Sequence, residues 1–286
     1  MTKKIALLAV GLIVVGACSS VVSALPAMGP PRALVGQDQY AVGLGYSHSQ
    51  MDLEAFGRAR EDPDGGGWLP ASYSKHRIED YTTNLILGRL DYGATQDLDV
   101  FLCLGFSDAQ DDMSEERATG SQGNEYSGLD CDFGFAWGLG ARATFWQEGD
   151  VTWGGLAQVI WENPDEGDIR VTPTDGDPSR LTGDAELELW EVQIAAGPTV
   201  QLEGFCVYGG PFLHFVRGDL DASLSGTDSF AAINRIELSQ DIRQESELGF
   251  YAGVQGDASE STSWYAEYRI TGDAWGVGVG AVRRFR

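Results

Sequence analysis

The sequence is short of the residues that build metal and redox sites. Its 286 residues include four cysteines and three histidines. The cysteines are Cys18, Cys103, Cys131 and Cys206, and no two of them are spaced as CxxC or as zinc ligands. An exported chain that loses Cys18 with its leader keeps an odd number, so at least one thiol stays unpaired or pairs between chains. The spacing therefore predicts isolated, small, core-type cysteines and no metal or cofactor.

Basic residues are also scarce. Lysine and arginine total 19 against 43 aspartates and glutamates, a formal net charge of −24 that argues against nucleic acid as a partner. The apolar run Ile5–Ala17 is too short for a transmembrane helix. It is preceded by two lysines and followed by Val22-Ser23-Ala24, the pattern of a cleaved export signal. We therefore expect residues 1–24 to be a signal peptide, 25–36 an N-terminal leader containing proline, and 37–286 the folded domain.

The same leader allows a second interpretation. Val15-Gly16-Ala17-Cys18 resembles a bacterial lipoprotein cleavage box, with Cys18 as the residue to be lipidated. The apolar Val21-Val22 and the second cleavage candidate favour ordinary removal.

Alternation of bulky and small residues is the dominant pattern between residues 131 and 161. From Phe133 to Phe145 every second residue is apolar, and the residues between are mostly small. After a turn at Gln147–Asp150 the alternation resumes and continues to Trp161. A strand places successive side chains on opposite faces, so both segments have one apolar face. Each is long enough to cross a bilayer as a tilted strand, which takes about 9–11 residues.

The alternation recurs along the chain and predicts about ten strands, with eight or twelve as alternatives. Tight turns alternate with long acidic connections, which are predicted as loops over 52–74, 108–130, 163–184 and 217–233. One connection breaks this pattern, because Thr271–Ala274 is short where a long one is expected. The pattern predicts an all-β, antiparallel, up-and-down transmembrane barrel.

A soluble barrel or sandwich, with its apolar face inside, shares this pattern. Glycine on its exterior would weaken the strands without a packing reason, whereas a narrow barrel admits only small side chains inside. Charges of both signs fall on the glycine-rich face, as a compensated polar interior requires. The predicted lumen-lining residues are Arg142, Glu191, His214, Glu247, Glu267, Arg269 and Arg284. The predicted lipid-facing residues are Phe133, Phe135, Trp137, Leu139, Trp153, Trp161, Trp190, Val192, Trp275, Val277, Val279 and Phe285.

With its export signal, alternating strands and closing strand from Trp275 to Phe285, the chain resembles the small outer-membrane β-barrels of Gram-negative-type bacteria, in the broad class of the opacity-type and omptin-type barrels. The resemblance covers residues 37–286 and rests on pattern, without a family-specific functional motif. It implies a place in the cell outer membrane, contact with outer-membrane lipid, and insertion by the barrel-assembly machinery. Barrels of this class typically end in an aromatic residue that serves as an assembly signal. Here Phe285 is penultimate and Arg286 follows, which departs from the class.

Histidines and carboxylates are the groups that suggest chemistry. A catalytic base needs hydrogen-bond reach to its nucleophile, and no spacing here fixes such reach, so structural or solvated histidines and no catalytic residue are expected. The omptin-type resemblance implies an alternative in which His48 and His76, beside Asp52 and Asp80, act at the outer rim. The acidic loops lack the D-x-D-x-D-G spacing of a calcium loop. We expect them to be solvated and to concentrate cations at the barrel mouth.

These expectations combine into a non-enzymatic outer-membrane barrel that serves as a structural or surface protein or as a narrow channel. Ten strands enclose much less space than the 16–18 strands of an open porin. One alternative is a barrel enzyme, acting on peptide or lipid at the outer rim through His48, His76 or His214. Another is an exported soluble or lipid-anchored β-protein.

Overall fold

The computed structural model describes residues 25–62, 67–115, 125–173, 181–226, 235–244 and 247–285. The predicted signal peptide with Cys18, the terminal Arg286 and parts of the predicted loops lie outside these ranges. Within the described ranges, no helix is long and apolar enough to cross a membrane.

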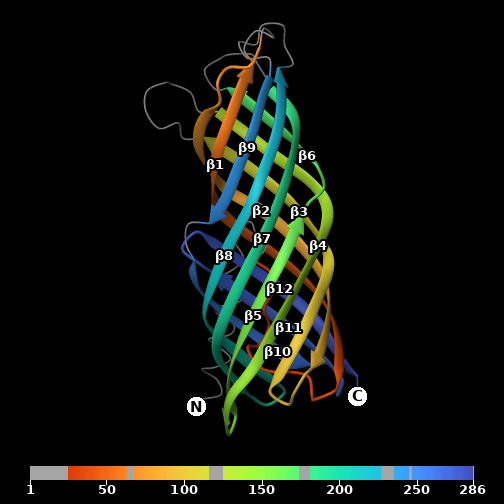
Figure 1. Ribbon diagram of the computed structural model, residues 1–286. Coiled ribbons are helices and arrows are strands. Elements are labelled where there is room, and N and C mark those ends of the chain that lie inside the picture. Colours follow the sequence, from red (N-terminus) through yellow and green to blue (C-terminus); the bar gives the residue numbers. More distant parts are fainter. Residues whose placement is uncertain are drawn as a thin grey trace.

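In this described part of the chain, twelve antiparallel strand segments form one closed wall (Figure 1). They are β1 (Tyr40–Asp62), β2 (Ser72–Gly93), β3 (Leu98–Glu115), β4 (Glu125–Glu148), β5 (Val151–Asn163), β6 (Gly167–Pro173), β7 (Leu181–Gln201), β8 (Phe205–Gly226), β9 (Arg235–Gln244), β10 (Leu248–Asp257), β11 (Thr262–Ile270) and β12 (Ala274–Phe285). In the lower part of Figure 1 the ring runs β1-β2-β3-β4-β5-β7-β8-β10-β11-β12, and β12 closes it on β1 from Tyr40↔Phe285 to Met51↔Ala274. The predicted ten-stranded, up-and-down antiparallel barrel is confirmed.

Above the tip of the β11–β12 hairpin the ring has eight strands. The hairpin ends partway up the wall, and β9 pairs there with β1, from Leu53↔Gln244 to Asp62↔Arg235. β9 and β10 share one wall position, because both pair with β8. In the same way β5 and β6 both pair with β4 and β7. The connection Thr271–Ala274, which is short where a long one was expected, is therefore the tip of the hairpin at which the barrel narrows from ten strands to eight.

Much of each predicted long loop is strand. β1 continues to Asp62, β3 to Glu115 and β8 to Gly226, while β6 lies wholly inside the predicted loop 163–184. These loop boundaries were wrong because acidic composition was taken as a sign of loops. The strands extend beyond the lipid into water, where charged side chains suit an outward face.

In the ten-stranded part, bulky apolar side chains face outward and form what we call the apolar belt. Of the predicted lipid-facing residues, the exposed ones are Phe133, Phe135, Trp137, Leu139, Trp153, Trp161, Val279 and Phe285, and the half-exposed ones are Trp190, Val192, Trp275 and Val277. A closed ring leaves no unpaired strand edge, which lipid does not tolerate. The belt on a closed ring identifies a membrane-spanning wall and overturns the alternative of a soluble β-protein with these side chains in its core.

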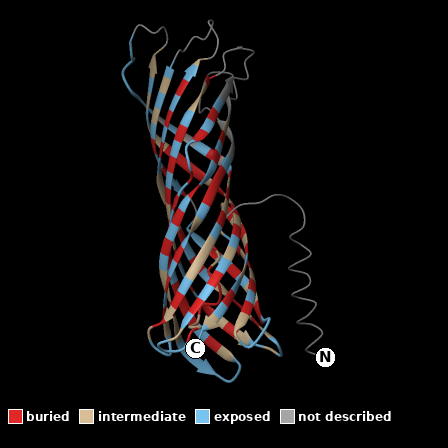
Figure 2. Cartoon of the chain, turned by 90° about the vertical axis from the view of Figure 1, so that its right-hand side faces the viewer, coloured by how far each residue is buried: buried red, intermediate tan, exposed pale blue. Residues whose placement is uncertain are grey.

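In the eight-stranded part the polarity of the two faces is reversed, although buried and exposed residues alternate along most of the described strand length (Figure 2). The inward side chains pack into one apolar core, which includes Leu53, Ala55, Ile78, Leu129, Ile169, Leu187, Leu189, Val216, Leu220, Leu224 and Ile242. Exposed charged side chains on the outward face include Arg58, Lys75, Arg77, Asp168, Asp184, Glu186, Glu188, Asp219, Asp221, Glu237, Asp241 and Arg243. This upper part therefore has the interior and surface of a protein in water, and we call it the extension.

The segment 25–36, expected as a leader, folds into the lower lumen. Leu25 and Met28 are fully buried, and Val35 is 3% exposed. Sequence periodicity gave no sign of this, because the segment forms no strand.

Candidate functional site

The lower lumen contains a buried cluster of four charges. Arg142 on β4 donates from Nε to Asp99 Oδ2 at 3.1 Å and from Nη2 to Asp91. Arg89 also binds Asp91, with Nε to Oδ2 at 3.2 Å. Both guanidinium groups lie over the ring of Phe101, at 5.2 Å for Arg89 and 5.6 Å for Arg142. Two positive and two negative groups thus compensate one another inside the wall, as buried charges must.

The segment 25–36 is bound to this interior mainly through its backbone amides. Glu267 accepts bonds from the amides of Met28 at 3.0 Å and Gly29 at 2.8 Å. Asp99 accepts from the amides of Leu34 at 2.6 Å and Val35 at 3.2 Å through its Oδ2 atom, while the Oγ atoms of Ser47 and Thr144 accept from Ala27 and Ala33. The wall contacts therefore come from β1, β3, β4 and β11.

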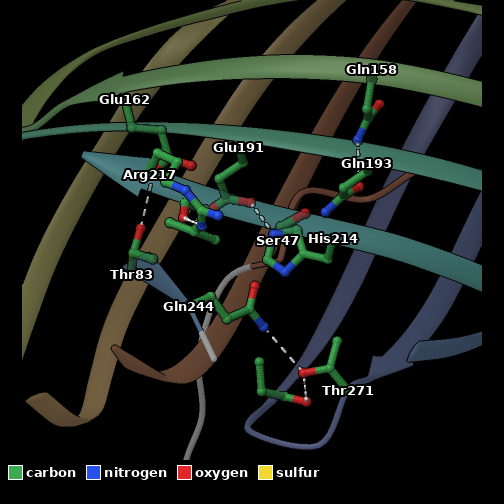
Figure 3. Close-up of polar contacts among 12 residues, drawn as sticks. Ser47, Thr83, Gln158, Glu162, Glu191, Gln193, His214, Arg217, Gln244 and Thr271 are labelled. Atoms are coloured by element: carbon green, nitrogen blue, oxygen red, sulfur yellow. Dashed lines mark hydrogen bonds and ion pairs between the residues drawn. The ribbon is translucent and has the colours of Figure 1, made fainter. Parts of the chain in front are cut away.

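Buried polar side chains from β2, β5, β7 and β8 form a layer in the lumen, which we call the polar layer (Figure 3). His214 Nε2 lies 2.9 Å from Glu191 Oε2, Gln158 donates to Gln193 at 2.8 Å, and Thr83 donates to Glu162 at 3.4 Å. Beside this layer, Arg269 is fully buried with its nearest carboxylate oxygen, Glu267 Oε1, 3.6 Å from Nε.

The structure brings most of the predicted lumen residues inside. Arg142, Glu191, His214, Glu267 and Arg269 are all 4% exposed or less. Arg284 lies on the inward side of β12 at the lower rim, where it is 38% exposed and 3.6 Å from Asp257. The prediction that Glu247 lines the lumen was wrong. It lies in the β9–β10 connection, 45% exposed and 3.8 Å from Arg217, because the strand breaks there before β10 begins.

The charged partners of Arg142 in this cluster, Asp91, Asp99 and Arg89, were not predicted. Their signal was present in the facing segments 85–93 of β2 and 98–106 of β3, where three charges interrupt residues that are otherwise apolar, aromatic or small. Charges at such positions in a membrane strand face the lumen and need partners.

Cys103, Cys131 and Cys206 are buried free thiols, as their spacing predicted. Within the described ranges, no group of three histidines, cysteines or carboxylates is arranged to hold a metal ion.

No protein-family model matches the chain, and no curated protein matches its sequence. Among solved structures, the chain is similar to the outer membrane protease OmpT from Escherichia coli, with 8% identity and a TM-score of 0.47 over 91% of this chain and 99% of that chain. It is also similar to the outer membrane protein OprG from Pseudomonas aeruginosa, with 11% identity and a TM-score of 0.37 over 88% and 98% of the two chains. A third is the toluene transporter TbuX from Ralstonia pickettii, with 12% identity and a TM-score of 0.40 over 90% and 92%. These proteins differ in activity, and likenesses at this level assign none of those activities to the chain.

The closed antiparallel ring, the apolar belt and the polar lower lumen are the features of one class of membrane protein. The chain is an outer-membrane β-barrel. Its location in the outer membrane, in contact with outer-membrane lipid, follows from the same features.

The histidines of this outer-membrane barrel do not form one site. His48 lies on the outward side of β1, stacked on Tyr46 with ring centroids 6.0 Å apart, whereas His214 is inside the lumen. The backbone of His76 pairs with Ala55 in the extension, and its side chain is outside the described set. The wall of the barrel therefore separates His48 from His214.

Above the belt, Asp219 lies directly across the ladder from two other acids. Its register partners are Glu188 on β7 and Asp241 on β9. Partial burial, followed by the charges of Asp241, Glu188 and Asp221, raises the pKa of Asp219. A carboxyl group with a raised pKa in the folded state favours unfolding once it ionises. Its effect on stability appears as the pH rises through the ordinary aspartate range toward the raised pKa.

Asp219→Asn is therefore expected to raise the free energy of unfolding at pH 7 by about 0.5 kcal/mol, because directly opposed like charges cost about 0.2–1 kcal/mol. Urea unfolding at pH 7 and at pH 3 is the measurement, and the gain should vanish at pH 3. Asp150→Asn, in the exposed β4–β5 turn, is the control. An equal gain in the free energy of unfolding at both pH values would contradict repulsion among Asp219, Glu188 and Asp241.

Proposed function

We propose that this outer-membrane barrel is a non-enzymatic and non-conducting surface protein, whose membrane wall anchors the water-exposed extension. One observation carries the proposal, which is that the lumen is filled at each described level. The segment 25–36 and the charged cluster fill its lower part. The polar layer fills the middle, and the apolar core fills the extension.

The apolar core argues most strongly for a closed lumen. Leu53, Leu187 and Leu220 come from different strands, are each 2% exposed or less, and belong to one packed cluster. An ion that crossed this core would lose its hydration without gaining polar partners. A cavity of about 30 Å³ lies lower down, beside Ala27, Arg89 and Tyr265. It has room for about two water molecules, since each needs roughly 10–15 Å³ by this measure.

The placement of the histidines supports a non-enzymatic role. His214 is bound to Glu191 inside the wall, and His48 lies on the other side of it. One substrate at the outer rim would not reach both.

The proposal includes two further partners, the barrel-assembly machinery and cations. Phe285 is 46% exposed and outward at the end of the closing strand, which supports its use as an assembly signal despite Arg286. The acidic outward face of β7 and β8 supports accumulation of cations at the cell surface.

Two measurements on the full chain test the proposal. In planar bilayers we expect no conductance steps above background, with an open porin as the positive control. On intact cells, a membrane-impermeant amine reagent should label Lys75, because this is the only lysine after residue 24 and its side chain is 54% exposed on the extension. Lys75→Arg should abolish that label. Regular conductance steps, or labelling only after the cells are broken, would overturn the proposal.

A further inference from the structure

Two buried carboxylates bind the N-terminal segment in the same way. Glu267 and Asp99 each accept bonds from two consecutive backbone amides of residues 25–36. Glu267 is 4% exposed and Asp99 is fully buried. Hydrogen bonds to a charged acceptor in a dry interior are stronger than neutral ones. The wall therefore recognises the backbone of the segment at two places six residues apart.

Glycines on the inner wall make room for the segment. A Cβ atom on Gly278 would lie 2.6 Å from the Cβ of Ala27, and one on Gly276 would lie 3.1 Å from the amide nitrogen of Leu25. Further along, a Cβ on Gly154 would collide with the carbonyl oxygen of Pro31. The segment thus lies directly on the wall, and small residues on both surfaces permit this approach.

The binding site is complete only when the barrel is closed. Its hydrogen-bonding side chains are Ser47, Asp99, Thr144 and Glu267, on four strands spread over almost the whole domain. The link to β1 is exposed over Gly36–Asp38, and the Asp38 amide donates to the Gly93 carbonyl at 2.9 Å. The segment therefore enters from the lower rim.

We propose that the lower lumen is a peptide-binding site in its own right, whose resident ligand is the chain's own segment 25–36, bound after the ten-stranded ring has closed. The ligand class is a short peptide rich in alanine, glycine and proline, with apolar residues at its first and fourth positions, as in Leu25 and Met28. This inference is separate from the proposed function, because a closed lumen does not require that the segment bind without its covalent link.

The test starts from the folded full chain. A recognition sequence for a specific protease is inserted after Gly36, in the exposed link, and cut once the barrel has folded in detergent. The fragment is expected to stay with the barrel through gel filtration. A heavy-isotope peptide of residues 25–36 is then expected to exchange with it, as measured by mass spectrometry.

Peptide variants leave the wall unchanged and test the contacts directly. A peptide N-methylated at Met28 and Gly29, which cannot donate to Glu267, is expected to exchange at least tenfold less well than the unmodified peptide. A scrambled peptide should not exchange.

A pair of complementary substitutions, one on the wall and one on the peptide, tests the close contact between Gly278 and Ala27. In the Gly278→Ala barrel, the natural peptide is expected to exchange at least tenfold less well. A peptide carrying Ala27→Gly is expected to restore exchange in this variant. Gly88→Ala is the control, because its added Cβ would lie at an ordinary 3.5 Å from the Leu104 carbonyl oxygen. Immediate release of the cut fragment from a barrel that stays folded would overturn the proposal, as would equal exchange of the scrambled peptide. Conductance is measured separately, so either proposal can fail alone.

Discussion

Replacing Arg142 with methionine is expected to lower the free energy of unfolding by about 3–5 kcal/mol, the usual cost of removing one partner from a buried ion pair. The guanidinium binds both Asp91 and Asp99, and all three side chains have no exposed surface. Methionine fills part of the volume, but Asp99 loses its cation and keeps the hydrogen bonds from the amides of Leu34 and Val35. Urea unfolding of the barrel in lipid vesicles measures the loss.

Two controls separate buried charge from charge in general. Lys75→Met removes a cation whose side chain is 54% exposed and bound to Glu54, and should cost at most about 1 kcal/mol. Arg142→Met combined with Asp99→Asn should recover part of the loss, because the negative charge of Asp99, which Arg142→Met leaves without a cation, is gone, whereas Asp91 keeps Arg89. An Arg142→Met barrel that unfolds at the same urea concentration as the natural chain would show that the cluster is not a main support of the lower lumen.

The wall in the membrane was predictable because one physical rule governs it. Lipid outside and a narrow interior favour apolar residues outward and mostly small residues inward, and Phe133 to Phe145 follow this rule with Arg142 as the one large inward side chain. The same parity placed Arg142 and Glu267 inside. It failed at Glu247, because the strand is broken there and parity does not pass through a break.

The strands of the extension were predicted as loops because their outward face is charged and their inward face is apolar, the reverse of the wall in lipid. Asp219, Asp221 and Ser223 alternate with Leu220, Ala222 and Leu224, which is a period of two like any other strand. The acidic members were taken as signs of a loop, and the apolar members were not weighed against them. Counting period-two matches over residues 217–226 would have found this strand.

The binding of segment 25–36 had no comparable signal. Backbone amides carry its contacts, and every residue except proline has one. Only the isolated acids Asp99 and Glu267 on the inner face hinted at a need for donors beyond the wall's own arginines.

Leu220→Asp is expected to unfold the extension while the ten-stranded wall stays in the membrane. Leu220 is 1% exposed in the apolar core of the extension, between the outward Asp219 and Asp221. Loss of a buried leucine costs about 2–5 kcal/mol, and an unpaired carboxylate in the same place adds to that. Limited proteolysis of the inserted protein should then cut within the extension, while the fragment below it still migrates as a folded barrel before boiling.

The same substitution seven residues earlier on β8 should act on the other face. Leu213 is 39% exposed on the apolar belt, so Leu213→Asp should reduce insertion into lipid and leave few folded barrels, without selective cleavage of the extension. Asp221→Asn, next to Leu220 but outward, should change neither result. The two variants on β8 thus probe both environments of the wall, because its outward face must be apolar in lipid and charged in the extension. If Leu220→Asp left the extension resistant to protease, or Leu213→Asp inserted normally, the reversal of polarity along the wall would be wrong.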